Sequence, residues 1–115
     1  MAITIFHNPR CSKSRATLAL LQERGLEPDI RPYLEHPPDA DELRAVLKKL
    51  RIPARALLRK GEAEYREQGL ADESLSEDDL VNAMAATPKL IERPIVIVGK
   101  KAALGRPPEA VLEIL

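Results

Sequence analysis

The single cysteine of the chain, Cys11, stands among residues that could make its thiol a nucleophile. A thiol reacts as the thiolate, and its pKa of about 8.5 falls beside cations and at the N-terminus of a helix. Arg10 precedes the cysteine, and Lys13 and Arg15 follow within the next helical turn. A lone cysteine is more often a buried, inert residue, but such a residue has apolar neighbours. The polar flanks therefore favour a reactive thiol.

The same segment could bind an anion. Backbone N–H groups at the start of a helix, together with nearby cations, form a binding site for an oxyanion. Ser12 and Ser14 add short hydroxyl donors. A nucleophilic sulfur in such a site indicates covalent attack on an oxyanion or capture of a sulfur-bonded substrate. His7 could tune the thiol, although a histidine at a strand end is more often packed or solvated.

Three arginines, Arg59, Arg93 and Arg106, stand at the expected ends of secondary-structure elements. A planar guanidinium group suits a tetrahedral oxyanion better than a lysine does. Arginines at such places are also common solvated residues, so composition alone favours the ordinary interpretation for each of them. A cis bond before Pro94 would bring the preceding residue near the cysteine loop. One cysteine and two histidines give no basis for a zinc site, and we expect no metal and no tightly bound cofactor.

Composition limits the class of protein. The chain has 115 residues, enough for one domain, and 44% hydrophobic and 31% charged residues are globular values. Eighteen basic and eighteen acidic residues cancel, so no net field attracts nucleic acid or an anionic membrane. No apolar run is long enough to span a bilayer, and residues 1–4 do not begin a signal peptide. A single thiol fits a reducing, cytoplasmic location.

Periodicity and turn residues predict the order strand, helix, strand, several helices, two strands and a final helix. The expected strands cover residues 3–6, 29–34, 95–98 and 102–104, and the first helix covers residues 12–24. Layer packing then gives an α/β fold with one mixed sheet flanked by helices. This is the order of a thioredoxin-like fold with a helical insert between the second and third strands. We expect a single domain over residues 1–115, with the insert at about 39–87.

Five segments of the sequence resemble, in the same order, those of the glutathione- and glutaredoxin-dependent arsenate reductases. They are His7 to Arg15 (HNPRCSKSR), Tyr33 to Pro38 (YLEHPP), Arg55 to Lys60 (RALLRK), Arg93 to Val96 (RPIV) and Gly105 to Pro107 (GRP). The resemblance differs at the C-terminus, where plasmid-borne members continue past the position of Leu115. It implies a thioredoxin-like fold and the reduction of arsenate as the activity.

The resemblance also implies the site residues. Cys11 would be the nucleophile that attacks arsenate. The oxyanion and the reduced arsenic would be held by three arginines, Arg59, Arg93 and Arg106. The thiolate would be supported by His7, Ser14 and the cis-proline Pro94.

Electron counting indicates which partners this reaction needs. Reduction of arsenic(V) to arsenic(III) takes two electrons, which two thiols supply when they become one disulfide. The chain has one thiol, so the second must come from outside. We therefore expect glutathione as a co-substrate and glutaredoxin as the partner that clears the mixed disulfide.

Two other functions remain open. Cys11 to Ser14 has the spacing of a dithiol motif that lacks its second sulfur, which would suit a monothiol oxidoreductase acting on glutathionylated proteins. Such an enzyme would not need arsenate or Arg59. A non-catalytic regulator of the same fold, which binds RNA polymerase through a two-cysteine switch, is the other alternative. This chain could not close that switch internally.

Overall fold

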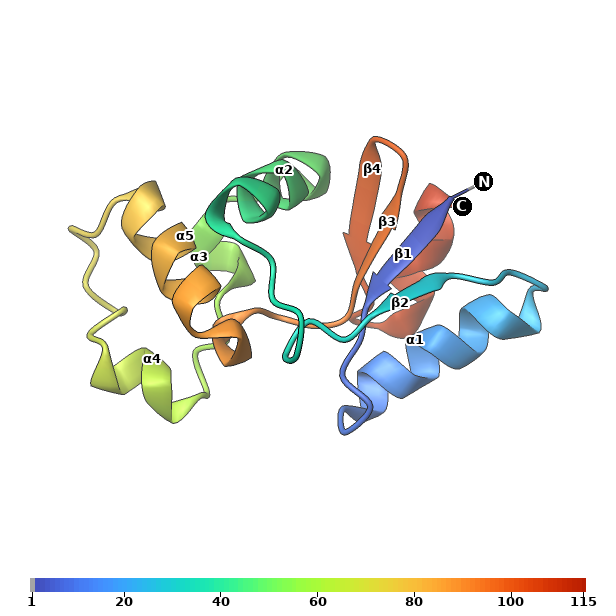
Figure 1. Ribbon diagram of the computed structural model, residues 1–115, viewed down its shortest axis with the longest axis horizontal. Coiled ribbons are helices and arrows are strands. Elements are labelled where there is room, and N and C mark those ends of the chain that lie inside the picture. The colour runs from blue at the N-terminus through green and yellow to red at the C-terminus, as the bar shows by residue number, and fades with distance from the viewer. Residues whose placement is uncertain (1) are drawn as a thin grey trace. The chain divides into compact units, whose positions relative to one another are not determined.

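The computed structural model describes residues 2–115 of the chain (Figure 1). The strands are β1 (Ile3–Phe6), β2 (Asp29–Arg31), β3 (Ile95–Val98) and β4 (Lys101–Leu104). The α-helices are α1 (Ser12–Glu23), α2 (Ala40–Leu50), α3 (Ala54–Leu57), α4 (Ala63–Glu67) and α5 (Glu77–Ala86). Two 3-10 helices are η1 (Pro88–Leu90) and η2 (Pro108–Ile114).

The four strands form one mixed sheet in the order β2-β1-β3-β4. β1 pairs with β2 in parallel and with β3 antiparallel, and β3 pairs with β4 antiparallel. The register sets Phe6 opposite Ile95, and Ile95 opposite Leu104. The end of β1, the start of β3 and the end of β4 therefore lie side by side at one end of the sheet.

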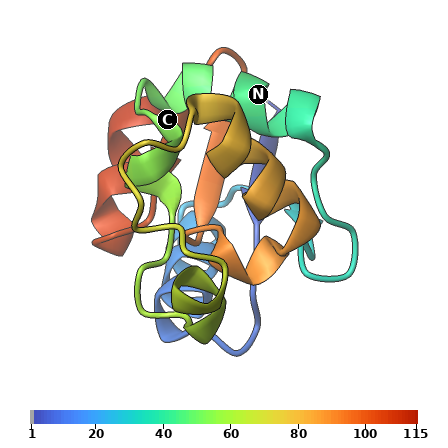
Figure 2. The same cartoon turned by 90° about the vertical axis from the view of Figure 1, so that its left-hand side faces the viewer.

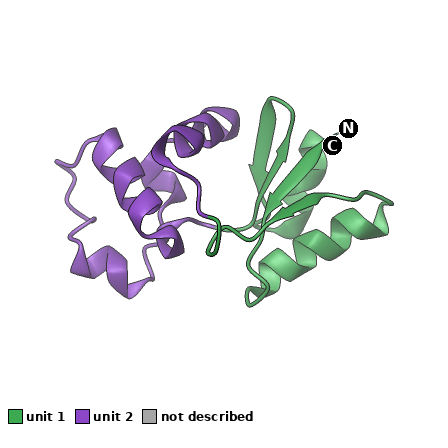
Figure 3. Ribbon diagram, viewed as in Figure 1, with its two compact units in different colours: residues 1–36, 93–115 green, residues 37–92 purple. Residues whose placement is uncertain are grey.

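The chain divides into two compact units, residues 1–36 with 93–115 and residues 37–92 (Figure 3). The first unit contains the sheet, α1 and η2. Its core joins one face of the sheet to these two helices through buried side chains: Ile3, Ile5, Leu21, Val96 and Val111. Ile3 and Ile5 share a face because successive side chains of a strand alternate between its two sides.

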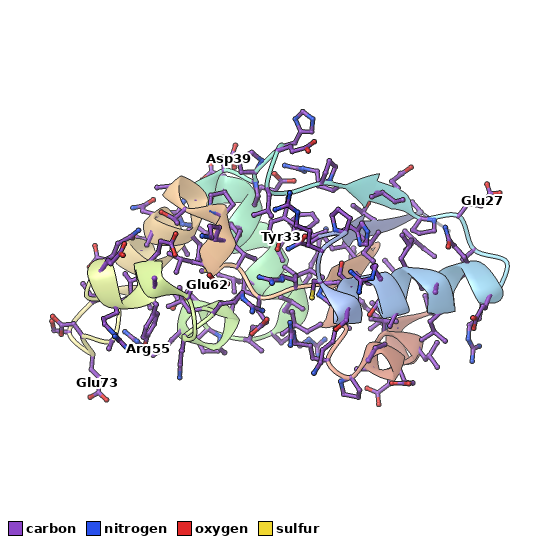
Figure 4. All side chains as sticks on the ribbon, turned by 90° about the horizontal axis from the view of Figure 1, so that it is seen from below. Glu27, Tyr33, Asp39, Arg55, Glu62 and Glu73 are labelled. Atoms are coloured by element: carbon purple, nitrogen blue, oxygen red, sulfur yellow. The ribbon has the colours of Figure 1, made fainter. Side chains whose placement is uncertain are left out.

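An aromatic pair supports the end of β1 in the same unit. The rings of Phe6 and Tyr33 stack with centroids 6.4 Å apart, and the Arg31 guanidinium lies over the Phe6 ring. Tyr33 is fully buried, and Figure 4 shows it surrounded by side chains, whereas Glu27 projects outward. The pair therefore fixes the strand end from which the cysteine loop departs.

The second unit contains the helices α2 to α5 and η1, together with an isolated antiparallel bridge between Leu58 and Ile91. α5 packs against α2, α3 and η1, and Figure 2 shows these helices after a turn of 90°. Both long helices have N-caps, since Asp39 accepts a hydrogen bond from the Glu42 N–H and Ser76 forms a reciprocal capping box with Asp79. Such caps satisfy N–H groups that the helix itself leaves without partners.

The mixed sheet flanked by helices, with helices inserted between β2 and β3, confirms the predicted fold class. The strand predicted at 29–34 is too long, because the Pro32 carbonyl accepts the N–H groups of Glu35 and His36 and turns the chain. The final helix is a 3-10 helix, and η1 was not predicted. The single domain over residues 1–115 and the extent of the insert at about 39–87 stay predictions. Within residues 2–115, no helix has the length and apolar composition needed to cross a bilayer.

Candidate functional site

Cys11 is the N-cap residue of α1 and has an extended backbone, with φ −98° and ψ 123°. Its N–H donates to the Asn8 carbonyl at 3.0 Å, and its carbonyl accepts the Arg15 N–H at 3.0 Å. The residue is buried, with 8% of its surface exposed. The backbone thus places the sulfur at the positive end of the helix, as the sequence indicated.

Two arginines of the first unit lie beside this residue. Arg93 precedes β3 and Arg106 follows β4, so the strand register brings both to the end of the sheet from which the cysteine loop departs. Nη2 of Arg106 lies 3.9 Å from Sγ of Cys11, and its Nε donates to the Arg93 carbonyl at 2.7 Å. The second contact fixes the guanidinium plane that faces the sulfur.

These surroundings favour the thiolate. Burial of the sulfur acts to raise the pKa of Cys11, but this effect is outweighed by the N–H of Ser14, the Arg93 guanidinium and the N–H of Lys13. The pKa of the thiol therefore lies below its ordinary value. A lowered pKa in a cationic setting is typical of a reactive cysteine.

The cysteine loop is held by a second group of polar side chains. Oγ of Ser14 lies 2.7 Å from Nδ1 of His7 and accepts the N–H of Asn8 at 3.0 Å. The Asn8 side chain in turn accepts the N–H of Arg10 at 3.0 Å. His7, Asn8 and Ser14 are all buried, so these hydrogen bonds satisfy groups that are shielded from water.

His7 is in its neutral form over a wider pH range than a free imidazole. Burial lowers its pKa, and the positive charge of Arg15 lowers it further. A neutral Nδ1 can accept a hydrogen bond from the Ser14 hydroxyl, whose oxygen already accepts the Asn8 N–H. In this arrangement His7 contacts Ser14 and orients the loop.

The bond between Arg93 and Pro94 is cis, as the family resemblance implied. The Pro94 carbonyl accepts the N–H of Gly105 at 3.0 Å, which joins the segments that carry the two arginines. The bond between Arg106 and Pro107 is also cis, a feature that the sequence analysis did not predict.

Arg59 belongs to the second unit and follows α3. Its Nη1 lies 2.6 Å from Oε1 of Glu92, and its Nε lies 3.3 Å from Oε1 of Glu62. The Arg59 N–H donates to the Leu90 carbonyl at 2.8 Å, so both its backbone and its guanidinium are held.

The first unit thus contains six of the seven predicted site residues, namely His7, Cys11, Ser14, Arg93, Pro94 and Arg106. Their roles stay predictions, as does that of Arg59. Two residues of these contacts were not predicted from the sequence: Asn8, which organises the loop, and Glu92, which is the partner of Arg59. Asn8 had a signal, since asparagine before proline often bonds a nearby backbone N–H, whereas the Arg59–Glu92 contact had none.

Known protein families and sequences match this chain over nearly its whole length. Residues 6–114 match the ArsC family. The chain is 57% identical to the uncharacterized protein YfgD of Escherichia coli K12, over 98% of this chain and 96% of that protein. It is 47% identical to the arsenate reductase of Haemophilus influenzae, with full coverage of both.

A solved structure also matches the whole chain. The arsenate reductase from Vibrio cholerae superposes with a TM-score of 0.98 at 51% identity, covering 100% of this chain and 98% of that chain. That structure and the chain share the thioredoxin-like fold over their whole length. In this chain, the fold brings Arg106, which follows β4, within 3.9 Å of the Cys11 sulfur. On this fold, on the match over residues 6–114 and on relatives that align from end to end, the chain belongs to the ArsC family.

Proposed function

We propose that the protein is an arsenate reductase in which Cys11 is the nucleophile. The observation that carries the proposal is the contact between Arg106 and the Cys11 sulfur, 3.9 Å, at a thiol whose pKa is lowered. Family membership supports arsenate as the oxyanion, since relatives that align along the whole chain bear the name arsenate reductase. A thiolate beside a guanidinium provides both a nucleophile and a group that binds a tetrahedral anion.

The first step is attack of the Cys11 thiolate on arsenic. An arsenic–sulfur bond forms, an arsenic–oxygen bond breaks, and the departing oxygen leaves as water after taking up protons. Arg93 and Arg106 would stabilise the negative charge on the remaining oxygens. Arsenic stays in the +5 state in this step, because the exchange of an oxygen ligand for a sulfur ligand does not change the oxidation number of arsenic.

Reduction needs two further thiols, both from outside the chain, because Cys11 is released as a free thiol and supplies none of the electrons. Glutathione displaces a second oxygen as water and forms a second arsenic–sulfur bond. The glutaredoxin thiolate then attacks the glutathione sulfur, and the electron pair of that arsenic–sulfur bond stays on arsenic, which becomes arsenic(III). Water hydrolyses the remaining Cys11–arsenic bond and releases arsenite. The two electrons come from two thiols that end as one mixed disulfide, so the reaction requires no tightly bound cofactor.

The other predicted residues have supporting roles in this proposal. The family resemblance supports Arg59 as a third arginine that binds arsenate. His7 and Ser14 would keep the cysteine loop in the geometry that favours the thiolate, and Pro94 would fix Arg93 beside it. A cytoplasmic location, where reduced glutathione is abundant, would suit these co-substrates.

A coupled assay tests the proposal. Purified protein is supplied with arsenate, glutathione, glutaredoxin and glutathione reductase, and NADPH oxidation is followed. We expect arsenate-dependent oxidation by the wild type and none above background by a folded Cys11→Ser variant. Arsenate-dependent turnover by that variant would falsify the assignment of the nucleophile, and no turnover by the wild type with any thiol donor would exclude the reductase.

Two further arms separate the alternatives. Replacing glutathione and glutaredoxin by thioredoxin and thioredoxin reductase identifies the electron donor, and we expect the glutathione system to be needed. Supplying a glutathionylated protein without arsenate tests the monothiol oxidoreductase. Comparable turnover in that arm, unaffected by Arg59→Gln, would favour that enzyme over the arsenate reductase.

A further inference from the structure

Gly105 lies where a side chain cannot fit. A Cβ atom at this position would clash with Oγ1 of Thr17 and would lie 2.6 Å from Cγ and 3.2 Å from Cδ of Pro94. Gly61 differs, since a Cβ there would meet no atom within 4 Å. Gly105 also lacks the positive φ that explains glycine at Gly25. Close packing, and not backbone conformation, therefore requires glycine at position 105.

Neither Thr17 nor Pro94 can move easily away from a larger residue at position 105. Thr17 is fully buried, and its Oγ1 donates to the Lys13 carbonyl at 2.8 Å, one turn earlier on α1. Pro94 is buried and follows Arg93, and its carbonyl accepts the Gly105 N–H at 3.0 Å. A side chain at position 105 must therefore displace the backbone of residues 105–107, because Thr17 and Pro94 are held in place.

The next residue is the arginine that faces the thiol. Arg106 reaches back to the Arg93 carbonyl through Nε at 2.7 Å and to the Cys11 sulfur through Nη2 at 3.9 Å. A shift of the backbone at 105 moves the origin of this side chain. Displacement of a positioned group by about 1 Å can cost about a hundredfold in rate.

We propose that Gly105 is a positioning residue, which lets the 105–107 segment lie directly on Thr17 and Pro94 and so holds the Arg106 guanidinium at the Cys11 sulfur. The effect on turnover rests on the proposed reductase function. The effect on the reactivity of the Cys11 thiol is independent of that function, because it concerns only the contact between Arg106 and the sulfur.

The test is Gly105→Ala, read out by alkylation of Cys11 with iodoacetamide as a function of pH. The expected result is a slower reaction at neutral pH and a midpoint at higher pH than in the wild type. In the arsenate assay, kcat/KM should fall by about ten- to a hundredfold. Gly61→Ala serves as the matched glycine control and should leave both measurements unchanged.

Two comparisons distinguish positioning from a general loss of structure. In an Arg106→Gln background, Gly105→Ala should add almost nothing to the shift of the alkylation midpoint, because the group that it displaces is already gone. Thr17→Ala removes one of the clashing atoms, so it should partly restore the profile of Gly105→Ala. Thr17→Val keeps an atom at that place and should not restore it.

The outcomes separate cleanly. An unchanged alkylation profile in folded Gly105→Ala overturns the inference, as do additive effects with Arg106→Gln. Should Gly105→Ala not fold by circular dichroism, Gly105→Ala with Thr17→Ala is compared with Thr17→Ala alone. Failure of that double variant to fold also overturns it, since the contact would then govern stability. A wild type that alkylates as expected but never reduces arsenate would refute the reductase and leave the positioning role of Gly105 supported.

Discussion

Oγ of Ser14 lies 2.7 Å from Nδ1 of His7, and both residues are buried. The serine occupies the place of the second sulfur in a dithiol motif that begins at Cys11. Its hydroxyl joins the first full turn of α1 to the end of β1 and also accepts the Asn8 N–H. This position of the motif therefore holds the loop together through hydrogen bonds of the Ser14 hydroxyl.

Loss of the Ser14 hydroxyl should destabilise the fold. Ser14→Ala leaves the buried Asn8 N–H without its acceptor, which costs about 1–3 kcal/mol. Urea unfolding measures this change. Ser12→Ala, at an exposed position of the same helix turn, is the control and should change the free energy of unfolding by less than about 0.5 kcal/mol. Equal effects of the two substitutions would contradict the importance of the Ser14 network.

The lowered pKa of His7 predicts a pH dependence of stability. In the unfolded chain His7 takes up a proton near pH 6.5, whereas in the folded chain burial delays protonation to lower pH. The unfolded state then binds more protons, so the free energy of unfolding falls as the pH drops below about 6.5. The contribution is fully present above that pH and is lost as the pH falls through the folded pKa.

Urea unfolding between about pH 7.5 and pH 5 measures this slope, which should be smaller in His7→Gln. The exposed His36 provides the matched control, and His36→Gln should retain the wild-type slope. A wild-type slope in His7→Gln would show that other groups cause the pH dependence.

Arg93 should control the reactivity of Cys11. Its guanidinium lowers the pKa of the thiol by a hydrogen bond and by its charge, so Arg93→Gln should raise that pKa. Alkylation with iodoacetamide at pH 7 should become slower by a factor of about three to ten, with the midpoint at higher pH. Arg10→Gln removes an exposed charge next to the cysteine in sequence and should have a smaller effect. The prediction is wrong if the two variants react alike.

The pair of Arg59 and Glu92 should contribute to the stability of the helical unit. The two side chains are only 22% and 23% exposed and lie 2.6 Å apart, so screening by water is incomplete. A double-mutant cycle with Arg59→Gln and Glu92→Gln should give a coupling of about 1 kcal/mol. The more exposed pair of Lys89 and Glu64 is the control and should couple more weakly. A weaker coupling for Arg59 than for Lys89 would refute this.

Local signals predicted most of the elements. Asp39 and Ser76 are residue types that favour helix starts, and they cap α2 and α5. Gly25 follows α1 with a positive φ, which is typical of glycine after a helix. The predicted strand over residues 29–34 ends earlier, at Arg31, because the Pro32 carbonyl accepts the N–H groups of Glu35 and His36 in a turn. These features depend on near neighbours in the sequence, which is why they could be predicted.

Contacts between distant segments could not be predicted in this way. Arg93 and Arg106 were recognised by residue type and by resemblance, but their common place at one end of the sheet follows from the strand register. The packing of Gly105 on Thr17 joins a strand end to the side of a helix, and no local pattern encodes it. The candidate reactive groups could therefore be recognised from the sequence more readily than the residues that hold them in place.

The early end of β2 has a consequence for the behaviour of the protein at high concentration. β2 forms one edge of the sheet, and an exposed edge strand can pair with the edge of another molecule and start aggregation. Here that edge offers only three residues before Pro32, which has no N–H to donate. Edge-to-edge association of sheets is thereby disfavoured by the same turn that leads the chain out of β2.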